Sequence, residues 1–442
     1  MRRSGVVRMS QTLAIRGGEP SVVTDLDSTV FRWPIMDGAS EARVLGVLRS
    51  RNLDGSGEVA AFEREFADYC GAEYAVGQTN GTSAVLAALW AVGVRRDTEV
   101  IVPATTYWAS AVPAQSLGAR VVFADIQPTT LTLDPADVAR KITSRTRAVV
   151  AVHLLGHPAD MAELRELADA RGVAIVEDAS HAHGSTYRGV RTGALGDVAA
   201  FSFHGKPIAA GEGGIVVTPH REVFERVLAW GQNFRLNSAE VSDPALLQFE
   251  GLPMGGVTSR LHPVSAALAR EQLTSLDERM AEVEQAMQYF WDGLTGIPFL
   301  LAHRPPKGDR TMGAWYQPHG IYRAEAAQGL SANGFMRAIR AEGFPSHARN
   351  IIREPLHRHP LFGTDVLDEE RWATVDARPA AGPLPNAERV KAFGVPPFKR
   401  FDKAVIDRYV EAYRKVADAY EDLLADDPGD GDGDGGSGSG NG

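Results

Sequence analysis

Short apolar segments alternate with helix-forming segments over the first half of the chain, and this alternation constrains the fold more than any other feature of the sequence. The apolar segments are four or five residues long, which is typical of strands buried on both faces. They lie at 74–77, 99–102, 120–124, 148–152, 173–176, 200–203 and 215–218, and helices are expected at 41–49, 59–69, 84–93, 109–117, 135–142 and 161–171. Because strands joined through helices pair in parallel, the pattern predicts an α/β fold with a mostly parallel sheet sandwiched by helices.

The pattern changes beyond Gly256, where a second domain is expected. Residues 263–290 have helical periodicity long enough to run from one domain into another, and shorter strands and helices follow. We therefore expect an N-terminal arm (1–30) that is mobile or laid over a neighbouring subunit, a large domain (31–270), a small C-terminal α+β domain (271–425) and a disordered tail (426–442). The tail is rich in Asp, Gly and Ser, and its DGDGDGG run lacks the Glu ligand of a calcium loop.

Composition excludes several classes of function. The chain has 442 residues, of which 44% are hydrophobic and 23% charged, as in ordinary globular proteins. Its formal charge is −10, part of which lies in the tail, and no basic stripe with interleaved aromatic residues indicates nucleic-acid binding. The single cysteine, Cys70, excludes an internal disulfide and a cysteine-rich metal site, and it fits a reducing cytoplasm. We expect no metal, no signal peptide and no membrane span.

The stretch 173–214 carries the clearest chemistry. Its strand ends at Glu177-Asp178, at the sheet edge where open α/β sheets bind ligands. Lys206 follows an aromatic strand and precedes a Gly-Glu-Gly-Gly run. A lysine and a carboxylate so placed suit pyridoxal phosphate, because the lysine forms a Schiff base and the carboxylate keeps the pyridine nitrogen protonated. Alternatively, Asp178 forms a turn or caps a helix and Lys206 is a surface lysine. Lysine is scarce, and none of the other six lies in such a loop, which favours the cofactor.

Two further loops follow strand ends. The polar loop 78–83 leads into a helix, whose N-terminus is suited to bind a phosphate, although Thr82 or Ser83 could simply be the helix cap. In the loop 103–108, Tyr107 or Trp108 could stack on a flat ring or fill the core. The segment 346–360 is dense in His and Arg, including Arg349 and His357, and could contact an acidic or hydroxylated substrate or form a solvated loop.

Several motifs resemble those of the DegT-type sugar aminotransferases, which belong to the aspartate aminotransferase fold group (fold type I). They are GSGEVAAFEREFADYCGAEYAV, TNGTSA, EVIVPATTYWASA, HPADMAEL, VEDASHAHGSTYRG, DVAAFSFHGK and GEGG, in that order, and the likeness covers residues 33–424. The resemblance implies a large pyridoxal phosphate-binding domain, a smaller α+β domain, pyridoxamine phosphate as the intermediate form of the cofactor, and a cytoplasmic homodimer that completes its active site across the two-fold interface.

The roles of the family's residues carry over by position. Lys206 matches the Schiff-base lysine, and Asp178 matches the partner of the pyridine nitrogen. Tyr107 matches the aromatic residue that stacks on the ring, and His181 stands near the ring hydroxyl. Gly81, Thr82 and Ser83 match the phosphate loop, with Ser202 as a further phosphate ligand.

The sequence departs from the family pattern at two places. Three residues separate Ser202 from Lys206 where the family usually has four, which shifts either the lysine or the serine. Thr258 stands where the family usually offers an Asn to the neighbouring subunit's phosphate. Either change could weaken cofactor binding, and neither removes the Schiff-base chemistry.

The resemblance implies ping-pong transamination, with Lys206 moving the proton. Glu or Gln would donate the amino group to a keto-cyclitol or a nucleotide-linked ketosugar in aminosugar or aminocyclitol biosynthesis, as in antibiotic pathways, and His357 and Arg349 are substrate-contact candidates. One alternative is a sugar dehydratase that uses the same cofactor, although the family members known for that reaction replace the lysine with His. A cofactor-binding regulator or an inactive partner subunit is the alternative from another class.

Overall fold

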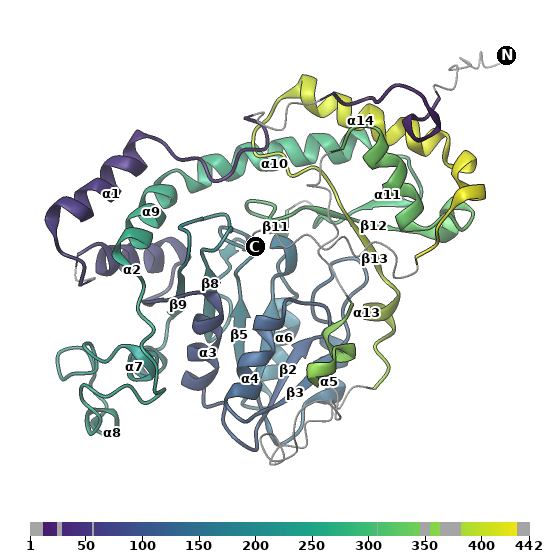
Figure 1. Cartoon of the computed structure of the whole chain (residues 1–442). Helices are drawn as coiled ribbons and strands as arrows, with labels where there is room; N and C mark the ends of the chain where they lie inside the picture. The colour runs from purple at the N-terminus through teal and green to yellow at the C-terminus, as the bar shows by residue number, and fades with distance from the viewer. Residues whose placement is uncertain are drawn as a thin grey trace.

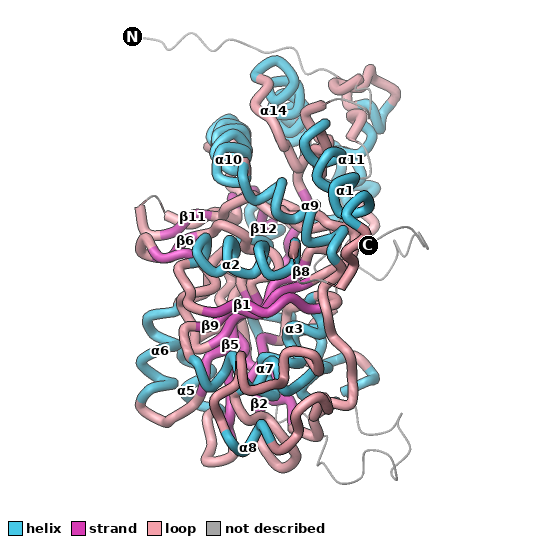
Figure 2. Tube along the Cα trace, turned by 90° about the vertical axis from the view of Figure 1, so that its left-hand side faces the viewer, coloured by secondary structure: helices cyan, strands magenta, loops and turns pink. Residues whose placement is uncertain are grey.

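The computed structural model describes residues 12–23, 29–54, 57–306, 308–344, 354–362 and 382–430. A large domain built around one sheet lies below a smaller domain, and both are visible in Figure 1. The predicted α/β fold class is confirmed, because the sheet is mainly parallel and helices lie on both of its faces (Figure 2).

The large sheet has seven strands in the order β1-β9-β8-β5-β4-β2-β3. The strands are β1 (Tyr74–Gln78), β2 (Glu99–Pro103), β3 (Arg120–Ala124), β4 (Thr146–Val152), β5 (Ala174–Asp178), β8 (Val198–Ser202) and β9 (Gly214–Thr218). Only β9 runs against its neighbours, β8 and β1. All seven predicted strands are therefore present. Asp178 is the last residue of β5 rather than a residue beyond it.

Both faces of this sheet are apolar. Val100 and Val102 of β2 join the core on one face, while Ile101 between them joins the core on the other, as the alternation of side chains in a strand requires. The helices of the large domain are α1 (Gly38–Ser50), α2 (Glu58–Cys70), α3 (Gly81–Ala91), α4 (Val112–Ser116), α5 (Pro135–Lys141), α6 (Met161–Asp169), α7 (Arg221–Gly231), α8 (Pro244–Leu247) and α9 (Pro263–Thr274).

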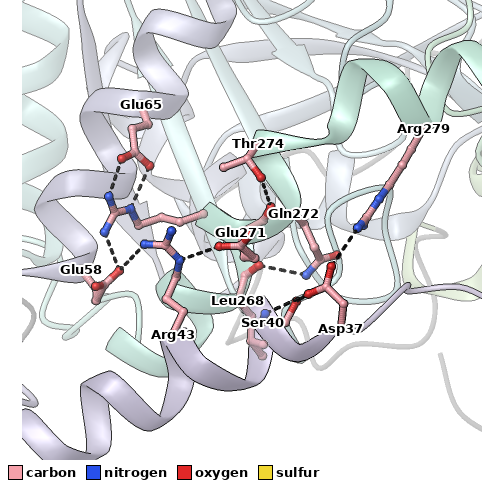
Figure 3. A network of polar contacts seen from close by, with 11 residues as sticks. Asp37, Ser40, Arg43, Glu58, Glu65, Leu268, Glu271, Gln272, Thr274 and Arg279 are labelled. Atoms are coloured by element: carbon pink, nitrogen blue, oxygen red, sulfur yellow. Dashed lines mark hydrogen bonds and ion pairs between the residues drawn. The ribbon is translucent and has the colours of Figure 1, made fainter.

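The long helix predicted over 263–290 is two helices, α9 and α10 (Leu276–Gly293), separated at Ser275. The backbone of Ser275 leaves the helical region, with φ −115° and ψ 9°. The apolar side chains of α9 lie in a core beside α1 and α2, and α10 begins in that same core with Leu276 and Met280 before it continues into the core of the small domain from Val283 onward. Ion pairs fix α9 and the start of α10 to the large domain, including Arg43 with Glu271 and Arg279 with Asp37 (Figure 3).

The small domain contains an antiparallel sheet in the order β10-β12-β13. Its strands are β10 (Leu300–Ala302), β12 (His319–Tyr322) and β13 (Lys391–Gly394), and its helices are α10, α11 (Ala332–Ala341) and α14 (Lys403–Asp418). A second small sheet joins β11 (Arg310–Thr311) to β6 (Thr186–Tyr187) and β7 (Val190–Arg191) of the large domain. The helix α13 (Pro385–Arg389) packs on the large domain, where Asp125 accepts hydrogen bonds from its backbone.

The ends of the described chain belong to the small domain. Residues 12–23 pack on the same chain, where the Glu342 carboxylate accepts hydrogen bonds from the N–H of Ala14 and from Ser21. These residues are therefore held on their own chain rather than free, and the prediction that the arm lies over a neighbouring subunit stays a prediction. Asp427, the second residue of the predicted tail, accepts hydrogen bonds from Ser331 at the start of α11, so the tail's first residues are structured, and 431–442 lie outside the described residues. Over the described ranges, no helix is both long and apolar enough to cross a bilayer.

Candidate functional site

Asp178 and Lys206 lie at the same edge of the large sheet. Asp178 ends β5 and pairs in register with Ala200 of the parallel strand β8. Lys206 follows the end of β8 by four residues. The structure therefore brings the two residues to the carboxyl edge of adjacent parallel strands, where this class of sheet binds ligands.

Asp178 is a buried carboxylate, 7% exposed, that has only neutral partners in the described structure. Ser110 donates a hydrogen bond of 2.6 Å from its hydroxyl to Oδ2, and the backbone N–H of Ser180 donates one of 3.2 Å to Oδ1. The hydrogen bond from Ser180 is the kind expected if Asp178 only forms a turn. It uses Oδ1 alone, so a turn does not account for Oδ2. A buried carboxylate without a cation is costly, so the residue fits a ligand that carries a positive charge, such as a protonated pyridine nitrogen.

Lys206 is half-buried, and its ammonium contacts Tyr316. Nζ donates a hydrogen bond of 2.8 Å to Oη of Tyr316 and lies 4.2 Å from the centre of that ring. Tyr316 also contacts His181, and the two rings stack with 4.3 Å between their centroids. Lys206 is therefore not the freely solvated lysine of the alternative interpretation.

Neutral His181 is oriented by the chain that follows β4. Burial, and then the charge of Lys206, lower the pKa of His181 well below its ordinary value. The N–H of Leu155 donates a hydrogen bond of 3.3 Å to Nδ1. An imidazole that accepts at Nδ1 carries its proton on Nε2 when neutral, so His181 is a hydrogen-bond donor suited to a ligand's hydroxyl or phenolate oxygen.

The N-terminus of α3 meets the end of β8. Asn80 caps the helix, since its Oδ1 accepts a hydrogen bond of 2.8 Å from the N–H of Ser83. The proposals that Thr82 or Ser83 is the cap are therefore wrong. The N–H groups of Gly81 and Thr82 come too early in α3 to bond within it, and no partner for them is found among the described residues.

Gly81 allows Ser202 to approach these N–H groups. A Cβ at Gly81 would lie 2.5 Å from Cβ of Ser202 and 3.0 Å from its Oγ. The two residues therefore touch, and only glycine fits at this contact. Free N–H groups, a serine hydroxyl and the positive end of a helix together fit a phosphate. The residues present thus match the phosphate, the ring nitrogen and the ring oxygen of pyridoxal phosphate.

Tyr107 precedes a turn that carries Ser110, the partner of Asp178. Its ring is 60% exposed and lies 5.1 Å from the ring of Trp108. The alternative that Tyr107 fills the core is wrong, and the exposed ring is available to cover a flat ligand.

The remaining candidates lie apart from this cluster or outside the description. His357 lies 3.2 Å from the Glu388 carboxylate of α13, and its ring centre lies 6.3 Å from that of Phe123 on β3, so its contacts are with α13 and β3 rather than with the loop that carries Lys206. Arg349 lies outside the described residues. Thr258 is exposed, and the next residue, Ser259, is buried and donates a hydrogen bond of 2.7 Å to Gln78.

Three residues of the site were missed by the sequence analysis: Ser110, Tyr316 and Trp33. Trp33 donates a hydrogen bond of 3.0 Å from Nε1 to the carbonyl oxygen of Lys206. Ser110 lies two residues beyond the candidate loop 103–108, so the nearness of its hydroxyl to that loop is a usable signal. Tyr316 and Trp33 reach Lys206 from distant parts of the chain, and no local pattern marks them.

Comparison with known proteins places this site in context. The model of the DegT/DnrJ/EryC1/StrS aminotransferase family matches residues 34–380. GDP-perosamine synthase of Caulobacter vibrioides is 36% identical over 400 residues, covering 89% of this chain and 100% of the relative. L-glutamine:2-deoxy-scyllo-inosose aminotransferase of Streptomyces fradiae is 37% identical over 390 residues, covering 83% and 89%. DesV of S. venezuelae, solved in complex with a ketimine intermediate, has a TM-score of 0.70 and 32% identity over 86% of this chain and 94% of its own.

Proposed function

Since the chain belongs to the DegT/DnrJ/EryC1/StrS aminotransferase family, we propose that it transfers an amino group from Glu or Gln to the ketone of a keto-cyclitol or a nucleotide-linked ketosugar. The chain is an aminotransferase, and its cofactor is pyridoxal phosphate. One observation carries the proposal: the same edge of the sheet holds both a lysine that is bound to an aromatic residue and a buried carboxylate that has no cationic partner among the described residues.

Lys206 is proposed as the residue that moves the proton. When bound, pyridoxal phosphate supplies an aldehyde that bonds to this lysine and a ring that withdraws electrons from the reacting carbon. In the first half-reaction, the released Nζ takes the proton from Cα of the amino donor; in the second, it delivers a proton to the former carbonyl carbon of the acceptor. Tyr316 accepts a hydrogen bond from Nζ and so holds the amine in place.

The other residues are proposed to bind and orient the cofactor. Asp178, held by Ser110, would pair with the ring nitrogen, and its burial strengthens this interaction because the local dielectric is low. His181 would donate from Nε2 to the ring oxygen. The N–H groups of α3 and the hydroxyl of Ser202 would bind the phosphate, and Tyr107 would cover the ring.

The two alternatives from the sequence lose support. The relatives are named as aminotransferases or as synthases of amino compounds, and Lys206 is retained, which argues against a dehydratase. A regulator or an inactive subunit does not need Lys206 and Asp178 at one edge of the sheet. We keep neither as a second candidate.

We also propose that two copies form a homodimer with shared active sites. Large apolar side chains are exposed near the site and in the loops on either side of α8, including Tyr107, Trp108, Phe234 (75% exposed) and Leu252 (68%). Exposed apolar groups of this size favour burial against a partner. The cytoplasmic location stays a prediction, supported by the free thiol of Cys70.

Spectroscopy with a substrate panel tests the proposal. The protein mixed with pyridoxal phosphate should show a visible absorbance band that Lys206→Ala lacks, and Glu or Gln should bleach it. The pyridoxamine phosphate form should then aminate a keto-cyclitol or a nucleotide-linked ketosugar. A band that no amino donor bleaches, or an amine-loaded protein that no ketone in the panel discharges, would contradict the proposal.

A further inference from the structure

A second lysine, Lys399, lies close to the surroundings of Lys206. It lies in the segment between β13 and α14 (Figure 1), and its backbone N–H donates a hydrogen bond of 2.7 Å to the carbonyl of Val30. Its Nζ lies 3.5 Å from the carbonyl oxygen of Ala314 and 5.5 Å from the centre of the Trp33 ring. The side chain is therefore fixed at both ends.

The neighbours of Lys399 are also the neighbours of Lys206. Trp33 donates a hydrogen bond to the Lys206 carbonyl, and Tyr316, two residues after Ala314, accepts one from the Lys206 ammonium. One indole ring and one short segment thus contact both lysines. We therefore expect a molecule that reacts at Lys206 to extend towards the Lys399 ammonium.

Lys399 lacks the partner that other lysines have. Four of the six lysines in the described part of the chain pair with carboxylates: Lys141, Lys391, Lys403 and Lys415. The two without a carboxylate are Lys206 and Lys399. The ammonium of Lys399 has three N–H donors. Among the described residues it makes one long contact, to the Ala314 carbonyl, and it lies over the ring of Trp33. An ammonium left in this state is costly unless a ligand completes it.

The ammonium of Lys399 stays mostly charged at neutral pH. Burial lowers the pKa of Lys399 to about 8, so most of it is protonated at neutral pH. As a residue, Lys399 is half-buried, like Lys206, Tyr316 and Trp33, so these side chains are not sealed in a core.

From this placement we infer that Lys399 binds a carboxylate of the substrate. The inference rests on the proposed function, since it assumes that the substrate reacts at Lys206. The carboxylate belongs either to the amino donor or to an acidic acceptor. It accepts a charge-assisted hydrogen bond from the Lys399 ammonium, which then has an anionic partner. Trp33 contributes its ring face to the cation from the other side.

Binding of glutarate, a dicarboxylate that carries no amino group, tests the inference directly. Calorimetric titration of the cofactor-loaded protein should give a Kd that Lys399→Met raises roughly 10- to 100-fold, as loss of a charge-assisted hydrogen bond predicts. Lys399→Arg should retain most of the affinity. Lys403→Met is the matched control, because Lys403 is exposed and pairs with Asp407, and it should change nothing.

Two half-reactions distinguish the sources of the carboxylate. If the donor supplies it, Lys399→Met should weaken glutamine about tenfold or more and leave 4-aminobutanamide, its decarboxylated analogue, unchanged. If the acceptor supplies it, the variant should weaken acidic ketones and spare neutral ones on the pyridoxamine phosphate form.

An unchanged glutarate Kd in a folded Lys399→Met protein overturns the inference. If that variant fails to fold, acetic anhydride labelling of the unsubstituted protein decides instead: glutarate should protect Lys399 but not Lys403, and equal labelling overturns the inference. Absence of a visible cofactor band in every protein tested, the unsubstituted one included, would refute the proposed function, whereas a normal band together with an unchanged glutarate Kd would overturn only the role of Lys399.

Discussion

The hydroxyl of Tyr316 offers the most direct test of how the site holds its reactive amine. Tyr316→Phe removes Oη, which accepts the 2.8 Å hydrogen bond from Lys206, and retains the ring that stacks on His181. A hydrogen bond to a charged group contributes about 1.5–3 kcal/mol. Both residues are half-buried, so we take the lower end of that range. This corresponds to a loss of roughly 10-fold in the rate at which Lys206 moves the proton.

Rapid mixing of the cofactor-loaded protein with glutamine measures this rate through the decay of the visible band. We expect the rate constant at saturating glutamine to fall, and the glutamine concentration for half-saturation to stay within about twofold, because Tyr316 positions the amine rather than the donor. Tyr74→Phe is the control, since Tyr74 lies at the start of β1 and its hydroxyl donates a hydrogen bond to the preceding residue, Glu73. An unchanged saturating rate in Tyr316→Phe would refute the positioning role, and a change confined to half-saturation would assign Tyr316 to donor binding instead.

Three further outcomes are expected. Gly81→Ala should weaken pyridoxal phosphate binding at least about tenfold in a fluorescence titration, because its Cβ would clash with Ser202; wild-type affinity would exclude this contact from the phosphate site. Burial lowers the pKa of His157 to about 3 and that of His303 to about 4, so each side chain is neutral in the folded protein at neutral pH. As the pH drops from 6.5 towards 4, the unfolded chain takes up protons that the folded protein does not. The free energy of unfolding should therefore fall by about 1 kcal/mol per pH unit for each histidine. Urea titrations across that range should show this slope, and a His157→Gln, His303→Asn variant with the same slope would contradict it. Glu342→Ala should destabilise the protein by about 3 kcal/mol, because it removes the carboxylate that holds residues 12–23; a change below about 0.5 kcal/mol in urea unfolding would show that this segment is not fixed by Glu342.

Local patterns predicted what local physics determines. The strands were predictable because a strand that is buried on both faces is a continuous apolar run. In β2, Ile101 packs in the core on one face of the sheet, and its two neighbours pack in the core on the other. Asp178 and Lys206 were found because each follows such a run. The helix cap was missed, since Asn80 and Thr82 are both good caps in isolation and the backbone of the preceding strand decides between them.

Contacts between distant segments were not predictable in the same way. Helical periodicity continues across Ser275, because apolar residues on both sides of it pack in one core, so the sequence pattern alone does not reveal the break. Trp33 and Lys399 belong to segments far from Lys206 in sequence, and they meet only because the small domain folds over the sheet edge. A lone lysine near a chain's end has no pattern that marks it as a binding residue.

The short loop before Lys206 shows how such distant contacts set local geometry. Trp33 holds the carbonyl of Lys206, the His183 ring accepts a hydrogen bond of 3.1 Å from the N–H of Ile208, and the Gln272 side chain accepts one of 3.0 Å from the N–H of Ala209. These three side chains come from different elements and fix the loop at and after the lysine. Before the lysine, His204 and Gly205 are exposed, and Gly205 adopts φ +58°. Because these anchors act at and after the lysine, we expect the shorter spacing to change only the approach of the chain before it, with Ser202 still against Gly81 and Lys206 still on Tyr316.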